Sequence, residues 1–307
     1  MSEAPDVRIV TEGLQFPEGP IAMADGSVVL VEVRRGTLSR VTPDGSTEIV
    51  AELGGGPNGA AVGPDGAVYV VNNGGFVWTE MGDWLLPLEL PSGATEPPGF
   101  QGGWIDRVDL TTGETTRIYE ECDGERFLGP NDIVFDAEGG FWFTDFGKIR
   151  PRNQDRGALY YALPDGSRVE QQAFSIIGPN GVGLSPDGDR VYVAETYTGR
   201  LLAWDLEGPG HIAGAGGLGH GAEVVAATAD HFDSLAVEAG GNVAVAAINH
   251  GVAVVTPDGQ VDHVAMPDAV TTNVCFAGTT AHVTLSGRGA LGTLEWPRPG
   301  LELAFNA

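Results

Sequence analysis

Basic residues are scarce in this sequence. Sixteen lysines and arginines stand against 42 aspartates and glutamates among 307 residues, which gives a net charge of -26. A molecule of this sign repels phosphate backbones and anionic lipid headgroups. We therefore expect neither nucleic acid nor a membrane surface as a partner, and we expect cations to be attracted.

Cysteines are few, and long apolar runs are absent. Cys122 and Cys275 lie 153 positions apart, so they form no paired zinc-binding spacing and predict two free thiols. No apolar run approaches the ~20 residues that cross a bilayer. The sequence begins with MSEAPDVR, which is polar and unlike a secretory signal. These features predict a cytoplasmic protein.

Several catalytic motifs are missing as well. The sequence has no GxSxG nucleophile elbow, no P-loop and no strand-linked GxGxxG segment. This argues against serine hydrolysis, nucleotide hydrolysis and dinucleotide redox chemistry. The six histidines show no HExxH spacing, so a histidine-based zinc site of that kind is not expected either.

Turn sequences, in contrast, are abundant and regularly spaced. Six times, a polar residue precedes a turn by seven positions, and a run with strand character follows the turn. Most of these turns are Asp-Gly or a close variant, and Asp-Gly between two apolar runs is a strong hairpin signal. The six polar residues are Glu18, Asn58, Asn131, Asn180, Asp233 and Asn273.

The spacing of these residues indicates the fold. They are separated by 40, 73, 49, 53 and 40 positions, and further turns divide each unit into about four strands. A four-stranded unit that recurs every ~40 to 50 residues is typical of a β-propeller blade. The sequence thus predicts an all-β fold, a single six-bladed β-propeller with four-stranded blades over residues 1–307. Pairing of VRIV at 7–10 with the strands near 292–296 would close the ring.

The six polar residues have a common place in such a fold. The first strand of each blade lines the central channel, so six residues at the start of six such strands converge at one end of it. Carboxylates and amides supply hard oxygen ligands, which suit Ca²⁺, with Mg²⁺, Mn²⁺ and Zn²⁺ as alternatives. The competing interpretation is that these side chains cap turns or pair with the channel backbone.

Three segments carry a resemblance to a known family: FPEGP at 16–20, GPNGVGLSPDG at 178–188 and DSLAVEAGGNVAVA at 233–246. They are similar to the patterns of the gluconolactonase, regucalcin (senescence marker protein) and luciferin-regenerating enzyme family. Its members are six-bladed propellers with one divalent ion in the channel. The blade layout covers essentially the whole chain.

The resemblance implies roles for individual residues. Glu18, Asn180 and Asp233 would hold the metal. Asn131 matches an asparagine that binds substrate in regucalcin and binds the ion in the related diisopropyl fluorophosphatase. The regucalcin branch carries an arginine two residues before that asparagine, where this sequence has Gly129. The resemblance therefore does not carry over specificity for sugar lactones.

The long spacing between Asn58 and Asn131 indicates an insertion at about 76–104. It is expected on the face where the six polar residues begin, and long loops without structure of their own are often lids. Its aromatic residues, Trp78 and Trp104 among them, would then wall a substrate pocket. Alternatively, they pack the insertion onto the rim of the propeller.

These features together predict a divalent-metal-dependent hydrolase of a cyclic ester, with a small-molecule lactone as substrate. Asp233 is the predicted base, or else it orients a water that the metal polarises. Asn58, Asn131 and His231 are expected to contact the substrate. Two alternatives remain: hydrolysis of an organophosphate at the same metal, and a calcium- or ligand-binding propeller without turnover.

Overall fold

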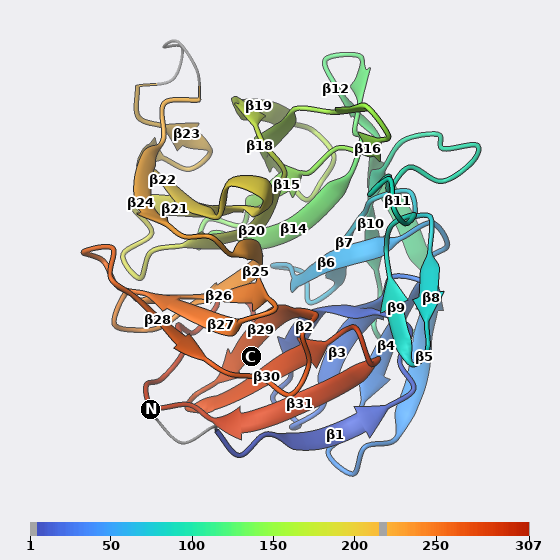
Figure 1. Ribbon diagram of the computed structural model, residues 1–307. Coiled ribbons are helices and arrows are strands. Elements are labelled where there is room, and N and C mark those ends of the chain that lie inside the picture. The colour runs from blue at the N-terminus through green and yellow to red at the C-terminus, as the bar shows by residue number, and fades with distance from the viewer. Residues whose placement is uncertain (1–4, 215–219, 307) are drawn as a thin grey trace.

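The computed structural model describes residues 5–214 and 220–306 and forms an all-β ring around a central channel (Figure 1). Six antiparallel sheets make up the ring, each with four strands from the channel outward, and one of them carries an additional short strand. In five sheets the strands follow in sequence order, and in the sixth the first strand of the chain is outermost. The predicted six-bladed β-propeller with four-stranded blades is confirmed.

We number the blades in chain order. The strands, from the channel outward, are as follows: blade 1, β2 (Pro17–Ala22), β3 (Val28–Glu32), β4 (Thr37–Val41), β5 (Thr47–Glu52); blade 2, β6 (Pro57–Val62), β7 (Val68–Asn72), β10 (Trp104–Val108), β11 (Thr115–Tyr119); blade 3, β14 (Pro130–Phe135), β15 (Phe141–Asp145), β18 (Gly157–Ala162), β19 (Val169–Ile176); blade 4, β20 (Pro179–Leu184), β21 (Arg190–Glu195), β22 (Arg200–Gly208), β24 (Glu223–Ala227); blade 5, β25 (His231–Val237), β26 (Val243–Ile248), β27 (Gly251–Val255), β28 (Val261–Val264); blade 6, β29 (Thr271–Ala277), β30 (Thr280–Leu285), β31 (Ala290–Glu295), β1 (Arg8–Glu12).

Short elements decorate this ring. They are the hairpins β8 (Thr79–Met81) with β9 (Trp84–Leu86), β12 (Glu121–Cys122) with β13 (Glu125–Arg126), and β16 (Ile149–Arg150) with β17 (Asn153–Gln154), the strand β23 (His211–Ile212) and the 3₁₀ turn η1 (Thr196–Thr198).

The first strand closes the ring by completing the last blade. Strand β1 pairs antiparallel with β31, with Arg8 opposite Thr293 and Ile9 opposite Gly292. This is the closure that the sequence predicts. It covers the edge of β31, which would otherwise expose free backbone donors and acceptors, and it ties the start of the chain to the last blade.

The repeated turns form for local reasons. In the turn after β2, the backbone N–H of Ser27 donates to the Asp25 carboxylate at 2.9 Å, and Gly26 has φ of +81°. An aspartate that accepts from the backbone two residues on, followed by a glycine in the left-handed region, is a stable hairpin connection. The same arrangement recurs at Asp65 and Gly66 in blade 2.

The hydrophobic core lies in layers between neighbouring blades. All residues of β3 and of β15 are buried, because both faces of these second strands are covered by adjacent blades. Between blades 2 and 3, Phe135 packs edge-on against Tyr69 with ring centroids 5.1 Å apart. Such aromatic packing adds to the burial of apolar area that holds the blades together.

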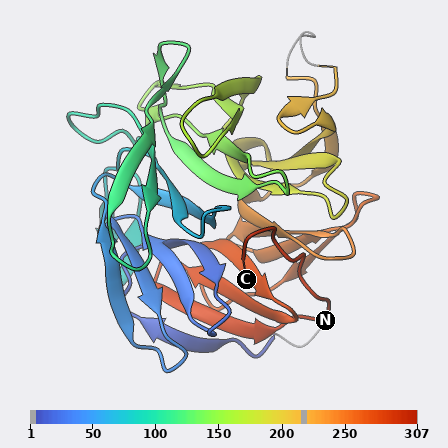
Figure 2. The same ribbon diagram turned by 180° about the vertical axis from the view of Figure 1, so that it is seen from behind.

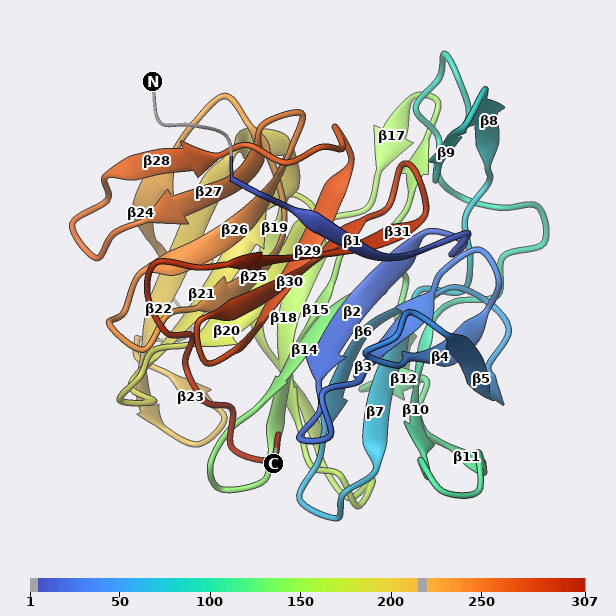
Figure 3. The ribbon, with the colours of Figure 1, turned by 90° about the horizontal axis from the view of Figure 1, so that it is seen from below.

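The insertion between β7 and β10 has structure of its own. It contains the β8–β9 hairpin, and it is fastened at both sides. The Leu85 N–H donates to the Gly287 carbonyl in blade 6, and the Thr95 N–H donates to the Ile149 carbonyl next to blade 3. Because it is held at two distant blades, the insertion is fixed on one face of the ring, where its β8–β9 hairpin stands at one side of the propeller (Figure 3).

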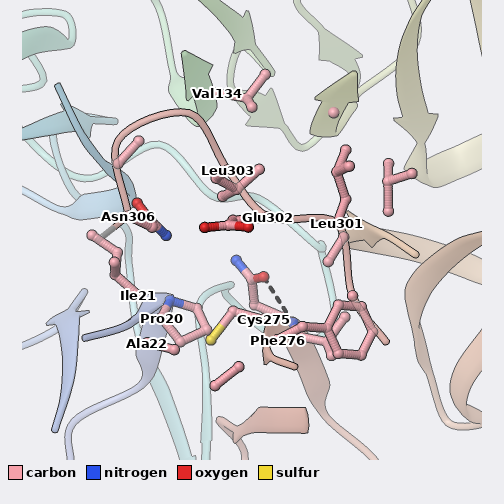
Figure 4. A pocket seen from close by; sticks show the side chains of 18 of the residues that line it. Pro20, Ile21, Ala22, Val134, Cys275, Phe276, Leu301, Glu302, Leu303 and Asn306 are labelled. Atoms are coloured by element: carbon pink, nitrogen blue, oxygen red, sulfur yellow. Dashed lines mark hydrogen bonds between the residues drawn. The ribbon is translucent and has the colours of Figure 1, made fainter. Parts of the chain in front are cut away.

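The opposite face of the channel is crossed by the C-terminal segment, residues 299–306 (Figure 2). The Leu301 N–H donates to the Val237 carbonyl in blade 5, and the Phe305 ring lies 5.9 Å from the Phe135 ring in blade 3. A cavity of about 680 Å³ lies between this segment and the innermost strands, with Leu301, Leu303 and Cys275 in its lining (Figure 4).

The sequence also bears on the two cysteines and on possible membrane-spanning helices. Cys122 and Cys275 are both free, as predicted, although Cys275 is only partly buried. In the part of the chain that the structure describes, no helix is long and apolar enough to cross a membrane.

Candidate metal and substrate site

The six polar residues that mark the repeats all lie near the start of an innermost strand. Each is the second or third residue of its strand, and the strands are β2, β6, β14, β20, β25 and β29. In every blade the pairing with the second strand shifts register at this position. Such a β-bulge turns a side chain away from its regular direction. The bulges therefore account for polar side chains inside an otherwise apolar channel wall.

The residue after the polar position decides how closely the innermost strands approach. A Cβ on Gly59 would lie 2.6 Å from the Cα of Asp132 in the next blade. A Cβ on Gly19 would lie 2.7 Å from the backbone nitrogen of Ala60. Both distances are too short for a side chain, so glycine keeps the ring narrow at this level.

Hydrogen bonds orient the four amides of the ring in two different ways. Asn58 accepts from Asn73 Nδ2 at 3.2 Å and donates to the Asn131 carbonyl at 2.9 Å. Asn273 Oδ1 accepts from the Val274 N–H at 2.8 Å, and its Nδ2 donates to Glu18 Oε2 at 2.8 Å. The amide oxygens of Asn58 and Asn273 are thus already satisfied by the protein.

Asn131 and Asn180 leave their amide oxygens available. Asn131 Oδ1 is buried and has no hydrogen-bond partner in the described structure. Asn180 donates to Thr196 Oγ1 at 3.2 Å, while its Oδ1 accepts a single hydrogen bond, from Ser234 Oγ at 3.4 Å. A buried acceptor without a donor is costly unless something else binds it. Among the four amides, Asn131 Oδ1 has no donor among the described residues and Asn180 Oδ1 has one long hydrogen bond, so these two oxygens are the best placed to bind a cation.

Burial and mutual repulsion raise the pKa values of the two carboxylates among the six polar residues. Burial raises the pKa of Glu18 to about 7, although hydrogen bonds from Asn273 and Gly19 oppose the shift. Burial, followed by repulsion from Glu18, raises the pKa of Asp233 well above its usual range. No lysine or arginine of the described residues forms an ion pair with either group. These two carboxylates have no basic partner in the described part of the chain, so together they favour the binding of a cation.

Asp132 is a third carboxylate that the repeat pattern does not reveal. It follows Asn131, accepts from the Ile133 N–H at 2.9 Å and from the Val182 N–H at 3.2 Å, and so bridges blades 3 and 4. Burial raises its pKa to about 7, and repulsion from Glu18 adds to the shift. Glycine follows most of the other polar positions. The carboxylate at position 132 therefore stands out in the sequence and could have indicated a further residue of the site.

The donor set as a whole fits a hard cation. No three His, Cys, Asp or Glu side chains converge as a metal-binding group within residues 5–214 and 220–306. A cation at this ring would therefore depend on amide oxygens beside the carboxylates. One amide oxygen without a donor, a second with a single long hydrogen bond, two carboxylates that repel each other and no thiol match the chemistry of Ca²⁺ binding.

His231 and Tyr197 lie at the edge of this ring. His231 is exposed at the start of β25, and its ring centroid lies 6.4 Å from that of Tyr197. Burial, and then the nearby Asp233 carboxylate, raise the pKa of Tyr197 to about 12. Tyr197 in turn packs edge-on against Phe146 at 5.6 Å. His231 is thus a rim residue two positions from Asp233.

The two predicted wall tryptophans lie in different places. Trp78 packs edge-on against Phe16 at 5.4 Å, two residues before Glu18, and so lies over blade 1. Trp104 instead begins β10, the third strand of its blade, where its Nε1 donates to Asp106 at 2.6 Å. The Arg117 guanidinium covers its ring at 4.1 Å. The structure therefore does not bring Trp104 together with the six polar residues at the channel.

No side chain fits at position 129. A Cβ on Gly129 would lie 2.6 Å from the carbonyl oxygen of Gly147. Arg126, the nearest arginine before it, is exposed, and its Nη1 donates to the Gln101 carbonyl at 2.7 Å. The arginine of the regucalcin branch thus has no counterpart at this point of the backbone.

The fold and the ring define a class of protein, the six-bladed propeller with oxygen donors around one end of its channel. Within this class, the chain belongs to the SMP-30/gluconolactonase/LRE-like family, whose model matches residues 16–285.

Relatives of known name support this placement. Gluconolactonase of Zymomonas mobilis is 25% identical over 219 residues, which cover 64% of this chain and 54% of the relative. Lactonase drp35 of Staphylococcus haemolyticus is 31% identical over 208 residues, covering 67% and 55%. The chain thus spans about half the length of the curated relatives it matches.

A solved structure supports the fold. The calcium-binding protein regucalcin of Agrobacterium tumefaciens superposes with a TM-score of 0.73 at 19% identity, covering 97% of this chain and 95% of that one.

Proposed function

We propose that this protein is a divalent-metal-dependent lactonase. The observation that carries the proposal is the ring itself, in which the orphaned amide oxygen of Asn131 accompanies the mutually repelling carboxylates Glu18 and Asp233. The names of the relatives, gluconolactonase and lactonase, support a cyclic ester as substrate.

The proposed metal is Ca²⁺. Glu18, Asn131, Asn180 and Asp233 would hold it, because they combine two carboxylates with the two amide oxygens that have the fewest protein donors. Two carboxylates balance the charge of one divalent ion, and hard oxygen ligands suit Ca²⁺ better than softer metals. The description of the Agrobacterium regucalcin as a calcium-binding protein is consistent with this choice.

The bound cation would polarise the lactone carbonyl and stabilise the negative charge that develops on its oxygen. Asn58 would donate a hydrogen bond from Nδ2 to a substrate oxygen. Asp233 would accept a proton from the attacking water, whose oxygen forms the new bond to the carbonyl carbon. The ring C–O bond then breaks, the leaving oxygen takes up the proton, and a hydroxy acid is formed. Near neutral pH this acid releases one proton.

Proton release therefore tests the proposal. Purified protein is assayed with aliphatic lactones, aldonolactones and organophosphates, with added Ca²⁺ and after chelation. We expect lactones to be hydrolysed and the chelator to abolish turnover. Release from organophosphates alone would make the protein a phosphoryl hydrolase, and no metal-dependent release from any substrate would favour a binding module.

The position of Trp78 over blade 1, near Glu18, predicts a preference among lactones. Replacement of Trp78 by Ala removes an aromatic side chain beside Phe16, and we expect kcat/KM for bulky apolar lactones to fall about tenfold while small lactones lose little. Trp104→Ala is the matched control, because Trp104 is fastened to its own blade. Equal losses for small and bulky lactones in Trp78→Ala would show that Trp78 has a purely structural role.

A further inference from the structure

The sequence contains a single lysine, Lys148, among fifteen arginines. It follows β15 in blade 3, and only 1% of its surface is exposed. Lysine is almost never fully buried without a partner for its charge. The one lysine of this chain is therefore placed where lysine is least expected.

The surroundings of Lys148 offer dipoles and aromatic faces. Its Nζ donates to the Gly75 carbonyl at 2.8 Å and to Asn73 Oδ1 at 3.4 Å. The same nitrogen lies 4.3 Å from the ring centre of Phe76 and 5.0 Å from that of Phe100, both in the insertion. A cation over aromatic faces is partly stabilised by them.

No carboxylate of the described residues lies within ion-pair distance of the Lys148 ammonium. Asp145, Glu96 and Asp155 act on it from farther away and favour its charged form. Burial outweighs them and lowers the pKa of Lys148 to about 7. A buried ammonium without a close carboxylate lowers the stability of the fold. This loss indicates that Lys148 has a function in the protein.

A chain of hydrogen bonds leads from Lys148 to the ring. Asn73 Oδ1 accepts from Lys148 Nζ and from the Gly75 N–H at 2.8 Å, so the oxygen of this amide must face them. Asn73 Nδ2 then faces Asn58 and donates to its Oδ1 at 3.2 Å. As a result, Asn58 directs Nδ2 toward the ring, where it donates to the Asn131 carbonyl at 2.9 Å.

We propose that Lys148 is a positioning residue that, through Asn73, fixes the Asn58 amide as a hydrogen-bond donor at the site. The catalytic consequence, that Asn58 binds an oxygen of the lactone, rests on the proposed function. The orientation also explains why Asn58 does not join the metal ligands, since its N–H would face the cation. The insertion takes part, because Phe76 and Phe100 exclude water from the Lys148 ammonium.

A double-mutant cycle tests the chain of contacts. We measure kcat/KM for the best lactone at saturating Ca²⁺ in wild type, Lys148→Met, Asn58→Ala and the double variant. Lys148→Met should lower kcat/KM about tenfold, as expected when one hydrogen bond of the site is lost. In the Asn58→Ala background the same change should cost less than about twofold, because interacting residues are not additive. An equal loss in both backgrounds would overturn the proposal.

Further readouts separate positioning from general destabilisation. Calcium affinity should stay within about twofold of wild type in Lys148→Met, since no ligand is moved. Asn73→Ala serves as the matched control, because it interrupts the chain between Lys148 and Asn58. It should reproduce the kinetic effect of Lys148→Met, and the two changes combined should add little to either alone.

A measurement without substrate keeps the inference independent of the proposed activity. In nuclear magnetic resonance spectra, Lys148→Met should move the side-chain amide signals of Asn73 and Asn58 but leave those of Asn180, in another blade, unchanged. An unchanged Asn58 signal would overturn the positioning role. If wild type hydrolyses no lactone, the proposed function fails, and the spectra alone decide whether Lys148 orients Asn58.

Discussion

Metal-free protein is expected to unfold at progressively lower temperatures as the pH rises from about 5 to 7. Glu18 and Asp132 both have a pKa of about 7 in the folded state, raised from 4.5 and 3.8. The folded protein therefore binds more protons than the unfolded chain across this interval. Stability falls with pH wherever the folded state binds more protons, so the loss is complete only above pH 7.

Calcium should remove this loss, because the cation favours the ionised carboxylates that are otherwise forced together. At about 1,000 times the Kd, binding to the folded state alone adds about 4 kcal/mol to the free energy of unfolding. Thermal unfolding curves at several pH values, with Ca²⁺ and after exhaustive chelation, measure both effects. The difference between the melting temperatures with Ca²⁺ and after chelation should increase from pH 5 to 7.

Glu18→Gln provides the matched control for the pH effect. It removes one of the titrating groups and also relieves the repulsion that acts on Asp132 and Asp233. The metal-free variant should therefore lose less stability than wild type between pH 5 and 7. Identical curves with and without Ca²⁺, together with no ion by elemental analysis, would rule out the metal site.

The repeat and its ring residues could be predicted because both are local features. Each Asp-Gly turn specifies its own hairpin, and the polar residue lies at a fixed distance before it. The closure of β1 onto β31 follows from the need to cover an edge strand. Six units with the same layout leave little choice of fold, so positions such as Glu18 and Asn180 follow from the spacing.

Contacts between segments far apart in the sequence could not be predicted in this way. Asn58 and Asn131 look alike in the sequence, yet Asn73 satisfies the oxygen of one while the other has no partner. Trp104 is predicted as a pocket wall because it is the last residue of the insertion at 76–104. The strand register places it in β10 beside Asp106 instead.

At saturating calcium, Glu18→Gln and Asp233→Asn are expected to differ strongly in activity. Each substitution preserves shape and an oxygen while it removes one negative charge, so both should weaken calcium binding. Glu18 accepts from Asn273 and from the Gly19 N–H, contacts that hold it as a fixed ligand. Asp233 lies two residues from the exposed His231, at the end of β25 that opens to solvent, and is the proposed acceptor of the proton from water.

The difference should appear once binding is no longer limiting. With calcium saturating, Glu18→Gln should recover substantial activity, whereas Asp233→Asn should stay depressed by the ~10² to 10⁴ that follows the loss of a general base. Calcium titrations of kcat separate the two effects, because a lost ligand is overcome by more metal and a lost base is not. His231→Gln is the control for the rim. If both ring variants recover to wild-type rates and His231→Gln does not, the base is His231, and Asp233 serves the metal alone.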